Sequence, residues 1–525
     1  MGAQDDALLA ELPQRLNAIP RRWAAETPDA LALSEGSATW TWRQLAEAVD
    51  EAVALLRASA VRAGDRVMIV GENCAAQIAL IFAAAELDAW SVNVNARLSP
   101  AEIDAIRTHC GARRVLYTVA VSPDAAAHGE RHGAAPIERA RLGRLSLGAL
   151  NEACTPEPVE MGGAQQVAAL VYTTGTTGHP KGVMLTHRNL LFIAATSSRL
   201  RQLTPADRVY GVLPISHVYG LASVMLGTLY AGAALQVVPR YAPQALIDAL
   251  EHDGVTVLQG VPAMYARLLE FTGGGWSPAK TRLRFIYAGG SPLDPTLKRE
   301  VERVFGQTLH NGYGMTESSP TISQTRVDAP RADTSVGPAI PGIELRIVDL
   351  DGQDVAEGEP GELWVRGPNV MKGYYREPEL TADTMRPGGW LNTGDVARRD
   401  ADGALFIVGR TKELIIRSGF NVYPVEVEAA LNSHPAVTQS AVVGREVADG
   451  NEEVVAFVEL DPARAVGIEE LQRYLAERLS PYKCPSEIVV MPAMPAAATG
   501  KILKGQLKER AQQMYRSSQH AAAGR

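Results

Sequence analysis

The chain has little cysteine: four residues in 525, at Cys74, Cys110, Cys154 and Cys484. No two of them form a C-x-x-C pair, which argues against the zinc sites that are built from such pairs. A disulfide framework is equally unexpected, because such frameworks belong to short, cysteine-dense secreted chains. The pattern fits a reducing compartment, and we expect the protein to be cytoplasmic.

The chain also lacks a basic block and a long uninterrupted apolar run. Its net charge of −8 argues against an extended footprint on nucleic acid or on an anionic membrane. The most apolar stretch, residues 221–238, is interrupted by Ser223, Thr228, Tyr230 and Gln236. These polar side chains predict a buried helix followed by a strand rather than a transmembrane segment.

Helical and strand-like patterns alternate through the first two-thirds of the chain. Residues 41–44 form a capping box that opens a helix. Buried strands are expected at 66–70, 255–258 and 283–287. The alternation predicts largely parallel sheets with helices on both faces. Ligands of such sheets bind at the carboxyl ends of the strands, where residues 173–181 and Gly289 are expected to lie.

The pattern changes after about residue 335. Short alternating strands, such as 344–348 and 362–366, predict a small and mostly β region. A compact α/β unit is expected from about residue 412, with helices at 425–431 and 467–479 and strands at 438–443, 453–460 and 486–491. The alanine-rich tail from Gln512 is predicted to be frayed. A chain of this length is expected to contain two or more domains.

The stretch YTTGTTGHPKG at 172–182 follows an apolar strand pattern and concentrates threonine, glycine and one lysine. It is not a Walker-type loop, since Pro180 stands in place of the second glycine and Gly182 in place of the final hydroxyl residue. Glycine permits close backbone approach to phosphate, threonine hydroxyls donate, and Lys181 adds a cation. The alternative is an ordinary surface turn.

Five further motifs follow this loop in order: PISHVYG at 214–220, NGYGMTE at 311–317, TGD at 393–395, GRTKELI at 409–415 and TGKILK at 499–504. The series resembles the adenylate-forming superfamily of acyl-CoA synthetases, peptide-synthetase adenylation domains and luciferases. The resemblance extends over roughly residues 25–505. The family usually has a basic residue and a threonine before its last Gly-Lys, whereas this chain has Pro495 followed by three alanines and Thr499.

The resemblance implies an α/β fold with a large N-terminal domain, made of two doubly wound sheets and a small β-barrel, and a small mobile α+β C-terminal domain. It places the domains at 1–411 and 412–525, with a hinge near Lys412. It also implies the chemistry: a carboxylate attacks the α-phosphorus of ATP to give acyl-AMP and pyrophosphate, and a thiol then takes the acyl group. ATP, CoA and Mg²⁺ are the expected cofactors.

Residue roles follow from the resemblance motif by motif. Thr173, Thr174, Gly175, Thr176, Thr177 and Lys181 would wrap the β- and γ-phosphates, and Gly289, Gly290, Asn311, Gly312 and Tyr313 would line the adenine. Thr316 would donate to the α-phosphate, Glu317 would hold Mg²⁺, and Asp395 and Arg410 would bind the ribose. Lys501 would act on the substrate carboxylate, and the loop with Ser418 and Gly419 would complete the CoA tunnel. Taken alone, Tyr313 fits a core aromatic, Glu317 and Lys501 fit solvated charges, and Asp395 fits a turn residue.

The acyl pocket is expected to have three walls: His217 with Val218, Tyr219, Ala222 and Ser223; Tyr287 to Gly290; and Gly312 to Ile322 with Gly314. His217 would act as a gate, although such a histidine alone is more often a core residue. These walls contain no Lys or Arg, so malonate and oxalate are unexpected. Ala222 stands where hydroxycinnamate ligases commonly carry a polar residue for the ring hydroxyl. Small residues at 220, 222, 289 and 290 predict room for an alkyl chain or an unsubstituted ring.

We therefore expect an ATP-dependent acyl-CoA ligase for a monocarboxylic acid, with a medium-to-long fatty acid favoured and an aryl acid next. One alternative is a stand-alone adenylating enzyme that loads a carrier protein, and another is an inactive nucleotide-binding regulator. The expected partners are a small carboxylic acid, ATP and CoA. No nucleic acid partner and no transmembrane segment are expected, and a homodimer is left open.

Overall fold

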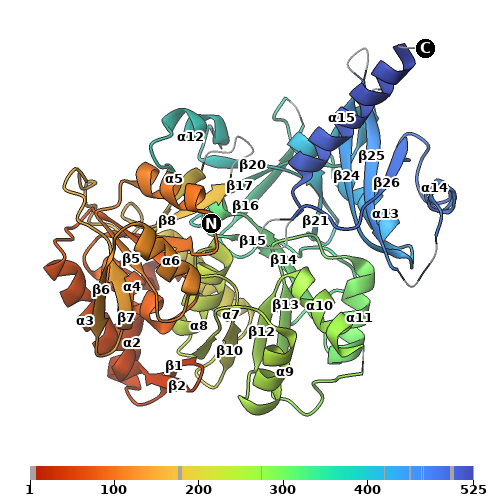
Figure 1. Cartoon of the computed structure of the whole chain (residues 1–525). Helices are drawn as coiled ribbons and strands as arrows, with labels where there is room; N and C mark the ends of the chain where they lie inside the picture. The colour runs from red at the N-terminus through yellow and green to blue at the C-terminus, as the bar shows by residue number, and fades with distance from the viewer. Residues whose placement is uncertain are drawn as a thin grey trace. The chain divides into compact units, whose positions relative to one another are not determined.

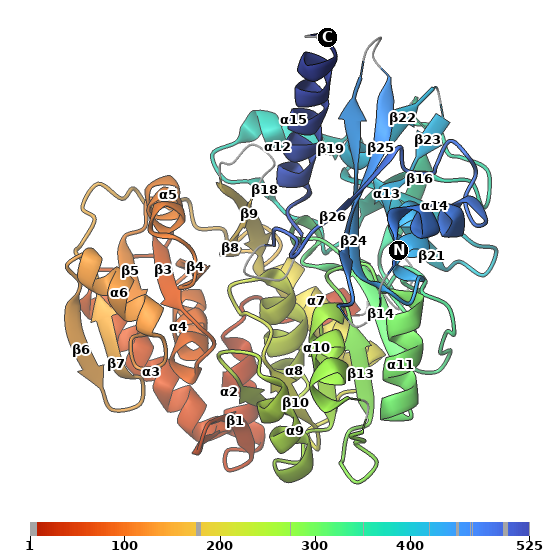
Figure 2. The ribbon, with the colours of Figure 1, turned by 45° about the vertical axis from the view of Figure 1, so that its right-hand side comes forward.

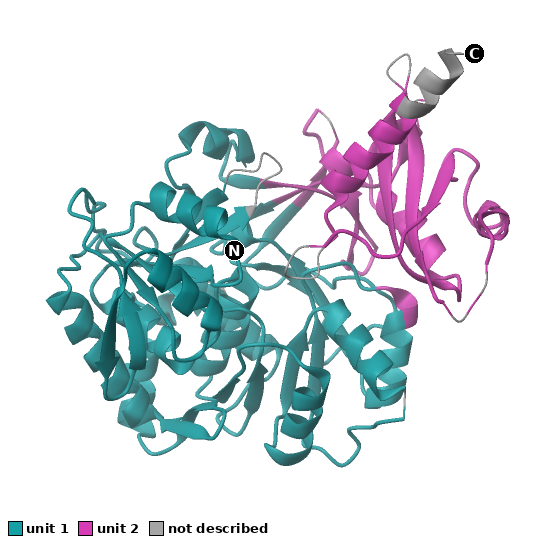
Figure 3. Ribbon diagram, in the orientation of Figure 1, with its two compact units in different colours: residues 1–293, 297–345, 365–391 teal, residues 294–296, 346–364, 392–525 magenta. Residues whose placement is uncertain are grey.

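The computed structural model describes residues 8–174, 180–273, 275–349, 351–418, 420–447, 451–462, 464, 466–496 and 502–523. Figure 1 shows the chain and the labels of its helices and strands. Two compact units are distinguished in Figure 3. Unit 1 consists of residues 1–293, 297–345 and 365–391, and unit 2 of residues 294–296, 346–364 and 392–525.

One eight-stranded sheet of unit 1 has the order β15–β14–β13–β12–β10–β11–β1–β2. Its strands are β15 (Thr321–Gln324), β14 (Leu309–Gly314), β13 (Phe285–Ala288), β12 (Val257–Gly260), β10 (Arg208–Gly211), β11 (Ala234–Val237), β1 (Leu31–Glu35) and β2 (Ala38–Thr41). The pairs from β14 to β1 are parallel, and only the outer strands β15 and β2 run antiparallel. The predicted parallel architecture is confirmed here.

A second eight-stranded sheet of unit 1 has the order β18–β9–β8–β4–β3–β5–β7–β6. Its strands are β18 (Gly373–Tyr374), β9 (Pro180–Thr186), β8 (Val167–Thr174), β4 (Trp90–Asn95), β3 (Arg66–Gly71), β5 (Arg114–Tyr117), β7 (Gly143–Leu147) and β6 (Ala135–Arg139). Its centre, β8–β4–β3–β5, is parallel. These central strands are almost entirely buried, as expected for a sheet covered on both faces.

Helices cover both sheets, as Figure 2 shows for α4, α7, α9 and α10. Their bounds are α2 (Ala18–Glu26), α3 (Trp42–Ala58), α4 (Ala75–Glu86), α5 (Pro100–Cys110), α6 (Pro123–Arg131), α7 (His187–Leu200), η1 (Tyr219–Leu226), α8 (Gly227–Tyr230), α9 (Pro243–His252), α10 (Pro262–Thr272), α11 (Pro295–Phe305) and α12 (Pro378–Thr384). The capping box predicted at 41–44 opens α3, with the Thr41 and Gln44 side chains each bonding the other residue's backbone.

The apolar stretch at 221–238 is a buried π-helix, η1, followed by α8 and strand β11. This confirms the prediction of a buried helix followed by a strand. Within the described ranges, no helix combines the length and the apolar character that crossing a membrane requires. A π-helical turn is rare and is often found at functional sites, and η1 begins in the predicted acyl wall.

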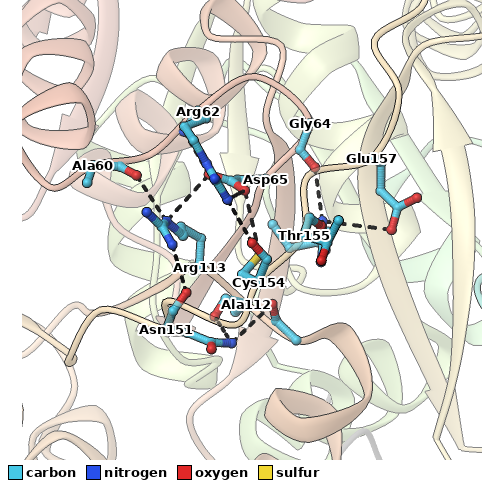
Figure 4. A network of polar contacts seen from close by, with 12 residues as sticks. Ala60, Arg62, Gly64, Asp65, Ala112, Arg113, Asn151, Cys154, Thr155 and Glu157 are labelled. Atoms are coloured by element: carbon cyan, nitrogen blue, oxygen red, sulfur yellow. Dashed lines mark hydrogen bonds and ion pairs between the residues drawn. The ribbon is translucent and has the colours of Figure 1, made fainter.

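Arginine side chains just before strands β3 and β5 hold the loop that precedes β8 by hydrogen bonds to its backbone at Asn151 and Cys154 (Figure 4). Arg62 donates to the Asp65 carboxylate at 3.0 Å and to the Cys154 carbonyl at 2.7 Å. Arg113 donates to the Asn151 carbonyl at 2.9 Å. These charge-assisted hydrogen bonds satisfy backbone carbonyls of an irregular segment, which has no neighbouring strand to bond them. This network is part of the scaffold.

A five-stranded sheet contains β16 (Glu344–Val348), β17 (Gly361–Arg366), β20 (Trp390–Arg399) and β19 (Met385–Arg386) in that order, with β21 (Leu405–Arg410) beside β20. It confirms the small β region predicted after residue 335. Unit 2 contains the sheet β24–β25–β26, made of Val437–Glu446, Glu452–Leu460 and Glu487–Val490. It is accompanied by α13 (Pro424–Asn432), α14 (Ile468–Ala476), α15 (Lys504–Ala523) and the hairpin β22 (Ile415–Arg417) and β23 (Phe420–Val422).

The predicted helix and strand order of this C-terminal unit is confirmed, but its predicted frayed tail is wrong. Residues 512–523 continue α15. Leu507 and Ala511 are buried, and the Gln512 side chain accepts from the Glu446 amide at 3.1 Å and donates to its carbonyl at 3.0 Å. A helix anchored on one buried face can continue where the sequence alone shows only polar and alanine residues.

Candidate active site

The predicted phosphate, adenine and metal residues of unit 1 lie at the ends of its strands. Thr173 pairs with Lys181 where β8 and β9 approach their connecting loop. Gly289 follows β13, and its amide donates to the Gly260 carbonyl at 3.1 Å. Thr316 and Glu317 form the short helix η2 (Thr316–Ser318), directly after β14. The positions agree with the rule that α/β sheets bind ligands beyond the carboxyl ends of their strands.

A buried tyrosine connects the predicted metal carboxylate with the predicted phosphate lysine. The Tyr374 hydroxyl donates to Oε1 of Glu317 at 2.7 Å, and both side chains are buried. Lys181 lies on β9, the strand next to β18, and its Nζ is 5.8 Å from the centroid of the Tyr374 ring. Burial, and next the Glu317 carboxylate, raise the pKa of Tyr374 far above its usual range, so the hydroxyl keeps its proton.

Sequence reasoning missed Tyr374. The only signal was the pair Tyr374-Tyr375 between Gly373 and Arg376, which a short buried strand also explains. Its position is fixed by β18, where Tyr374 pairs with Val183, and by the amide of Met371, which donates to the Glu317 carbonyl at 2.9 Å. The structure thus adds a residue to the candidate site.

The predicted adenine segment of β14 is tightly packed. The Asn311 side-chain amide donates to the carbonyls of Thr334 at 3.1 Å and Ser335 at 3.3 Å. A Cβ on Gly312 would lie 1.9 Å from the Tyr287 hydroxyl oxygen. Asn311 therefore anchors the strand, and Gly312 is required by the packing of Tyr287. Tyr313 is half-buried in the same strand.

The predicted acyl walls come together around two tyrosines. The rings of Tyr219 and Tyr287 lie edge to face with centroids 6.2 Å apart, and Gly289 packs against both rings. Val218, Ala222 and Ile322 are fully buried nearby in the same unit. A Cβ on Gly220 would lie 2.1 Å from the Pro214 carbonyl oxygen. The space beside Gly220 and Gly289 is therefore filled by protein atoms, and these two glycines do not open the predicted room for an alkyl chain or an unsubstituted ring.

His217 is exposed at the start of η1. The Tyr219 amide donates to its Nδ1 at 3.4 Å. This exposure rules out the alternative of a buried core histidine. A gate role for His217 stays a prediction.

Arg201 is the main residue of the acyl region that the sequence did not reveal. Its guanidinium carbon lies 4.8 Å from the centroid of the Tyr287 ring, and Nη1 donates to the Ser223 carbonyl at 3.1 Å. The side chain is fully buried. Both of its contacts are predicted wall residues, so a cation lies beside walls that themselves contain no Lys or Arg. Arg201 directly follows α7 and lies far from the walls in sequence, which is why wall motifs could not identify it.

His310 lies on the same face of the sheet. It pairs with Tyr287 in register, and its ring stacks on Phe285 with centroids 4.9 Å apart. Burial lowers the pKa of His310 to about 4, and the cations Lys298 and Arg201 act in the same direction. The imidazole is therefore neutral near pH 7 and adds no second positive charge beside Arg201.

The predicted ribose residues of unit 2 lie together. Asp395 and Arg410 are register partners on β20 and β21, with Nε of Arg410 3.3 Å from Oδ1 of Asp395. The Asp395 carboxylate is nearly buried and its backbone amide donates to the Thr393 hydroxyl at 3.1 Å. The two residues that the family resemblance assigns to the ribose thus meet across one strand pair.

The predicted hinge and CoA loop of unit 2 are exposed. Lys412 lies on the surface in η3 (Thr411–Glu413). Ser418 has a positive φ of 52°, and its amide donates to Oδ1 of Asn451 at 2.6 Å. Arg417 donates to the carbonyls of Tyr482 and Cys484 at 3.1 and 2.6 Å. Arg417 therefore supports the loop by binding backbone.

Five predicted site residues lie outside the described residues: Gly175, Thr176, Thr177, Gly419 and Lys501. Their roles stay predictions. In the described part of the chain, no cluster of three or more His, Cys, Asp or Glu side chains could hold a metal ion. A single carboxylate such as Glu317 fits Mg²⁺ that is shared with substrate phosphates, because that ion usually takes one or two protein carboxylates and keeps several waters.

Comparison with known proteins gives matches along nearly the whole chain. The AMP-binding enzyme family matches residues 20–375, and the AMP-binding enzyme C-terminal domain matches residues 426–501. A feruloyl-CoA synthase of Amycolatopsis sp is 35% identical over 505 residues, covering 95% of this chain and 99% of that protein. The 4-coumarate–CoA ligase 2 of Oryza sativa subsp. japonica is 32% identical over 529 residues, covering 92% and 90%.

Among solved structures, the o-succinylbenzoate CoA synthetase of Bacillus subtilis in complex with its acyl-adenylate intermediate is similar to this chain. It has a TM-score of 0.80 and 30% identity, covering 93% of this chain and 97% of that chain. These matches confirm the resemblance to adenylate-forming enzymes and the expected α/β fold.

Proposed function

The chain belongs to the AMP-binding enzyme family and is an ATP-dependent acid–thiol ligase of the acyl-CoA synthetase type; from this premise we propose that it activates an aromatic carboxylic acid and transfers it to CoA. In the first step a carboxylate oxygen bonds to the α-phosphorus of ATP and pyrophosphate leaves. In the second, the CoA sulfur bonds to the acyl carbon and AMP leaves with the bridging oxygen.

The observation that carries the chemistry is the arrangement of Lys181, Tyr374 and Glu317 in unit 1. Lys181 would neutralise phosphate oxygens, and Glu317 would hold Mg²⁺ through the oxygen that does not accept from Tyr374. When bound, the ion supplies positive charge that offsets repulsion between the two anionic reactants. Thr316, one residue before Glu317, would donate to the α-phosphate.

Two facts favour an aromatic acid over the fatty acid that the sequence favoured. The relatives matched over 90% or more of their own length include proteins named for feruloyl, coumarate and indoleacetate substrates, all of which are aromatic acids. In addition, Tyr219 and Tyr287 with Gly289 between them form an aromatic surface, on which a planar ring packs edge to face or offset. The filled space at Gly220 and Gly289 removes the volume argument for a long alkyl chain and for an unsubstituted ring alike, so it favours neither class of acid.

Pyrophosphate release across cinnamic, benzoic, fatty and dicarboxylic acids, each with and without CoA and Mg²⁺, tests the proposal. We expect CoA-dependent turnover to be highest with aromatic acids and to stop with EDTA. Turnover confined to fatty acids would overturn the substrate class. Release that stops near one equivalent per enzyme regardless of CoA would instead indicate a carrier-protein acceptor.

A further inference from the structure

We propose that the acid activated by this enzyme carries a second anionic group, a carboxylate on its aromatic ring, and that Arg201 binds this group. The inference rests on the proposed aromatic acid ligase and specifies its substrate further. It begins with a charge that has no counterion. Arg201 is fully buried, yet none of the described Asp or Glu side chains forms an ion pair with it.

The guanidinium is only partly satisfied. Nη1 donates to the Ser223 carbonyl at 3.1 Å and the guanidinium also faces the Tyr287 hydroxyl, while neither Nε nor Nη2 forms a hydrogen bond of good geometry. Removing one partner from a buried ion pair leaves an uncompensated charge, which is among the most destabilising arrangements in a protein interior. Buried arginines are therefore paired in nearly all folds. An arginine with two unused donors that lie side by side on its fork matches a carboxylate, which accepts from both.

Other unsatisfied polar groups surround the same place. Gln259 lies on β12 in register with Tyr287, the residue on which Arg201 stacks. Gln324 lies on β15 in register with Gly312, which packs against the Tyr287 hydroxyl. Both amides are buried, and neither the oxygen nor the nitrogen of either side chain has a partner. The hydroxyl of Tyr219 is buried without a partner as well.

Exposure decreases from His217 and Gly290 through Tyr219 to Arg201, which gives the predicted acyl site an outer and an inner end. His217 and Gly290 are exposed, Tyr219 is 8% exposed, and Arg201 is 0% exposed. Gly289, next to Gly290, packs against Tyr219 and Tyr287, and Arg201 stacks on Tyr287. An acid that presents its reacting carboxylate near His217 would thus place its ring against the tyrosine pair and its far end toward Arg201.

A formal negative charge fits this end better than a phenol or a methoxy group. His310 is neutral, and the nearby residues described above supply dipoles but no anion. Only an anionic ligand group neutralises the guanidinium, whereas a hydroxyl leaves the charge in place. The neutral amides of Gln259 and Gln324 can then donate to the remaining lone pairs of the carboxylate.

The test compares four ring-matched acids in the full-length enzyme with ATP, Mg²⁺ and CoA: cinnamate, para-carboxycinnamate, the para methyl ester of the latter, and para-hydroxycinnamate. We expect kcat/KM for para-carboxycinnamate to exceed that for its ester by on the order of a hundredfold, as when a buried charge gains its partner. An equal kcat/KM for both, or the highest value for para-hydroxycinnamate, would overturn the inference. Formation of no aryl-CoA from any of the four acids would instead count against the proposed aromatic acid ligase itself.

Variants of Arg201 test whether this residue causes the preference for para-carboxycinnamate over its ester. Arg201→Gln should abolish that preference, and Arg201→Lys should restore part of it, since the charge returns without the planar fork. Arg199→Gln is the matched control, because Arg199 lies two residues earlier, in the last turn of α7, but is exposed and paired with Glu11 at 3.1 Å. Protection of each variant against thermal unfolding by MgATP verifies folding independently of the acid. A preference that survives in folded Arg201→Gln would contradict the assignment.

Discussion

The hydroxyl of Tyr374 donates a 2.7 Å hydrogen bond to the carboxylate of Glu317, and it does so from inside the protein. The bond occupies one oxygen of the only carboxylate that the motif at 311–317 supplies. It fixes the direction of the other oxygen, which is the one we propose for Mg²⁺. Tyr374 is therefore a positioning residue in this account, and Glu317 is the residue that it positions.

Replacing Tyr374 by Phe should weaken the enzyme's response to magnesium. Loss of a partner that orients a metal ligand typically costs 10- to 100-fold in metal affinity or activity. We expect the Mg²⁺ concentration for half-maximal pyrophosphate release to rise by about tenfold, with a smaller change in the KM for the acid. A titration of Mg²⁺ at saturating ATP measures this shift, and Mg²⁺-dependent nucleotide binding by calorimetry gives a second readout.

The neighbouring tyrosine provides the control. The Tyr375 hydroxyl donates to Glu157 at 2.6 Å, away from Glu317, so Tyr375→Phe removes the same atom from a different partner. Its magnesium response should equal that of the wild type. If the two variants behave alike, Tyr374 has no special role in positioning Glu317.

Gly312 should not tolerate a side chain. The added methyl of Gly312→Ala would lie 1.9 Å from the Tyr287 hydroxyl and 2.8 Å from the Ser323 carbonyl. Overpacking of this kind costs about 1–3 kcal/mol. We expect a lower thermal midpoint and a raised KM for the acid, since Tyr287 must move.

In Gly275→Ala the nearest atom to the new methyl would be 3.5 Å away, which is an ordinary contact. This exposed glycine of the same unit should therefore accept alanine with little change in midpoint or KM. A similar loss in both variants would show that the packing around Gly312 is not the cause.

Sequence motifs identified the family and most strand ends, because a phosphate loop, a Gly-rich strand end and a TGD turn are local patterns. They could not identify Tyr374 or Arg201, which contact predicted site residues only through pairing and packing between segments far apart in the chain. The volume inferred at Gly220 and Gly289 was wrong for the same reason: composition shows that a residue is small, but only packing shows what fills the space.

The stability of unit 1 should fall in acid partly through His187. This side chain is fully buried, and the Leu16 amide donates to its Nδ1 at 3.2 Å, which requires the neutral ring. Burial, with a contribution from the Arg15 charge, lowers the pKa of His187 to about 3, below the 6.5 of the unfolded chain. The unfolded state therefore binds the extra proton between these values, and stability is lost as pH falls from about 6.5 toward 3.

Between pH 7 and pH 5, the titration of His187 should lower the free energy of unfolding by about 2 kcal/mol, which corresponds to about 1.4 kcal/mol for each pH unit below 6.5. His187→Asn keeps an oxygen acceptor for Leu16 but does not titrate. Urea unfolding at the two pH values should show a smaller acid shift in the variant than in the wild type. Equal shifts would mean that His187 is not the titrating group.

Lys501→Ala should block the first half-reaction, a prediction that rests on the sequence motif TGKILK. One cation about 4 Å from developing charge, at an effective dielectric near 20, contributes roughly 4 kcal/mol. That corresponds to about a thousandfold in rate. Pyrophosphate release should fall by this factor in Lys501→Ala, while attack of CoA on supplied acyl-AMP should be largely retained. In the control Lys508→Ala, which changes an exposed lysine, both half-reactions should be largely retained. Equal loss in both half-reactions would contradict separate roles for the two steps.

We propose that the acid is activated as an acyl-adenylate before its transfer to CoA. Tracing the oxygen atoms of the reacting carboxylate into the products tests this order of steps. An aromatic acid labelled with heavy oxygen in its reacting carboxylate is turned over with ATP and CoA, and the products are analysed by mass spectrometry. We expect one labelled oxygen in each AMP, and aryl-CoA as the second product. Label in inorganic phosphate, with ADP in place of AMP, would contradict it.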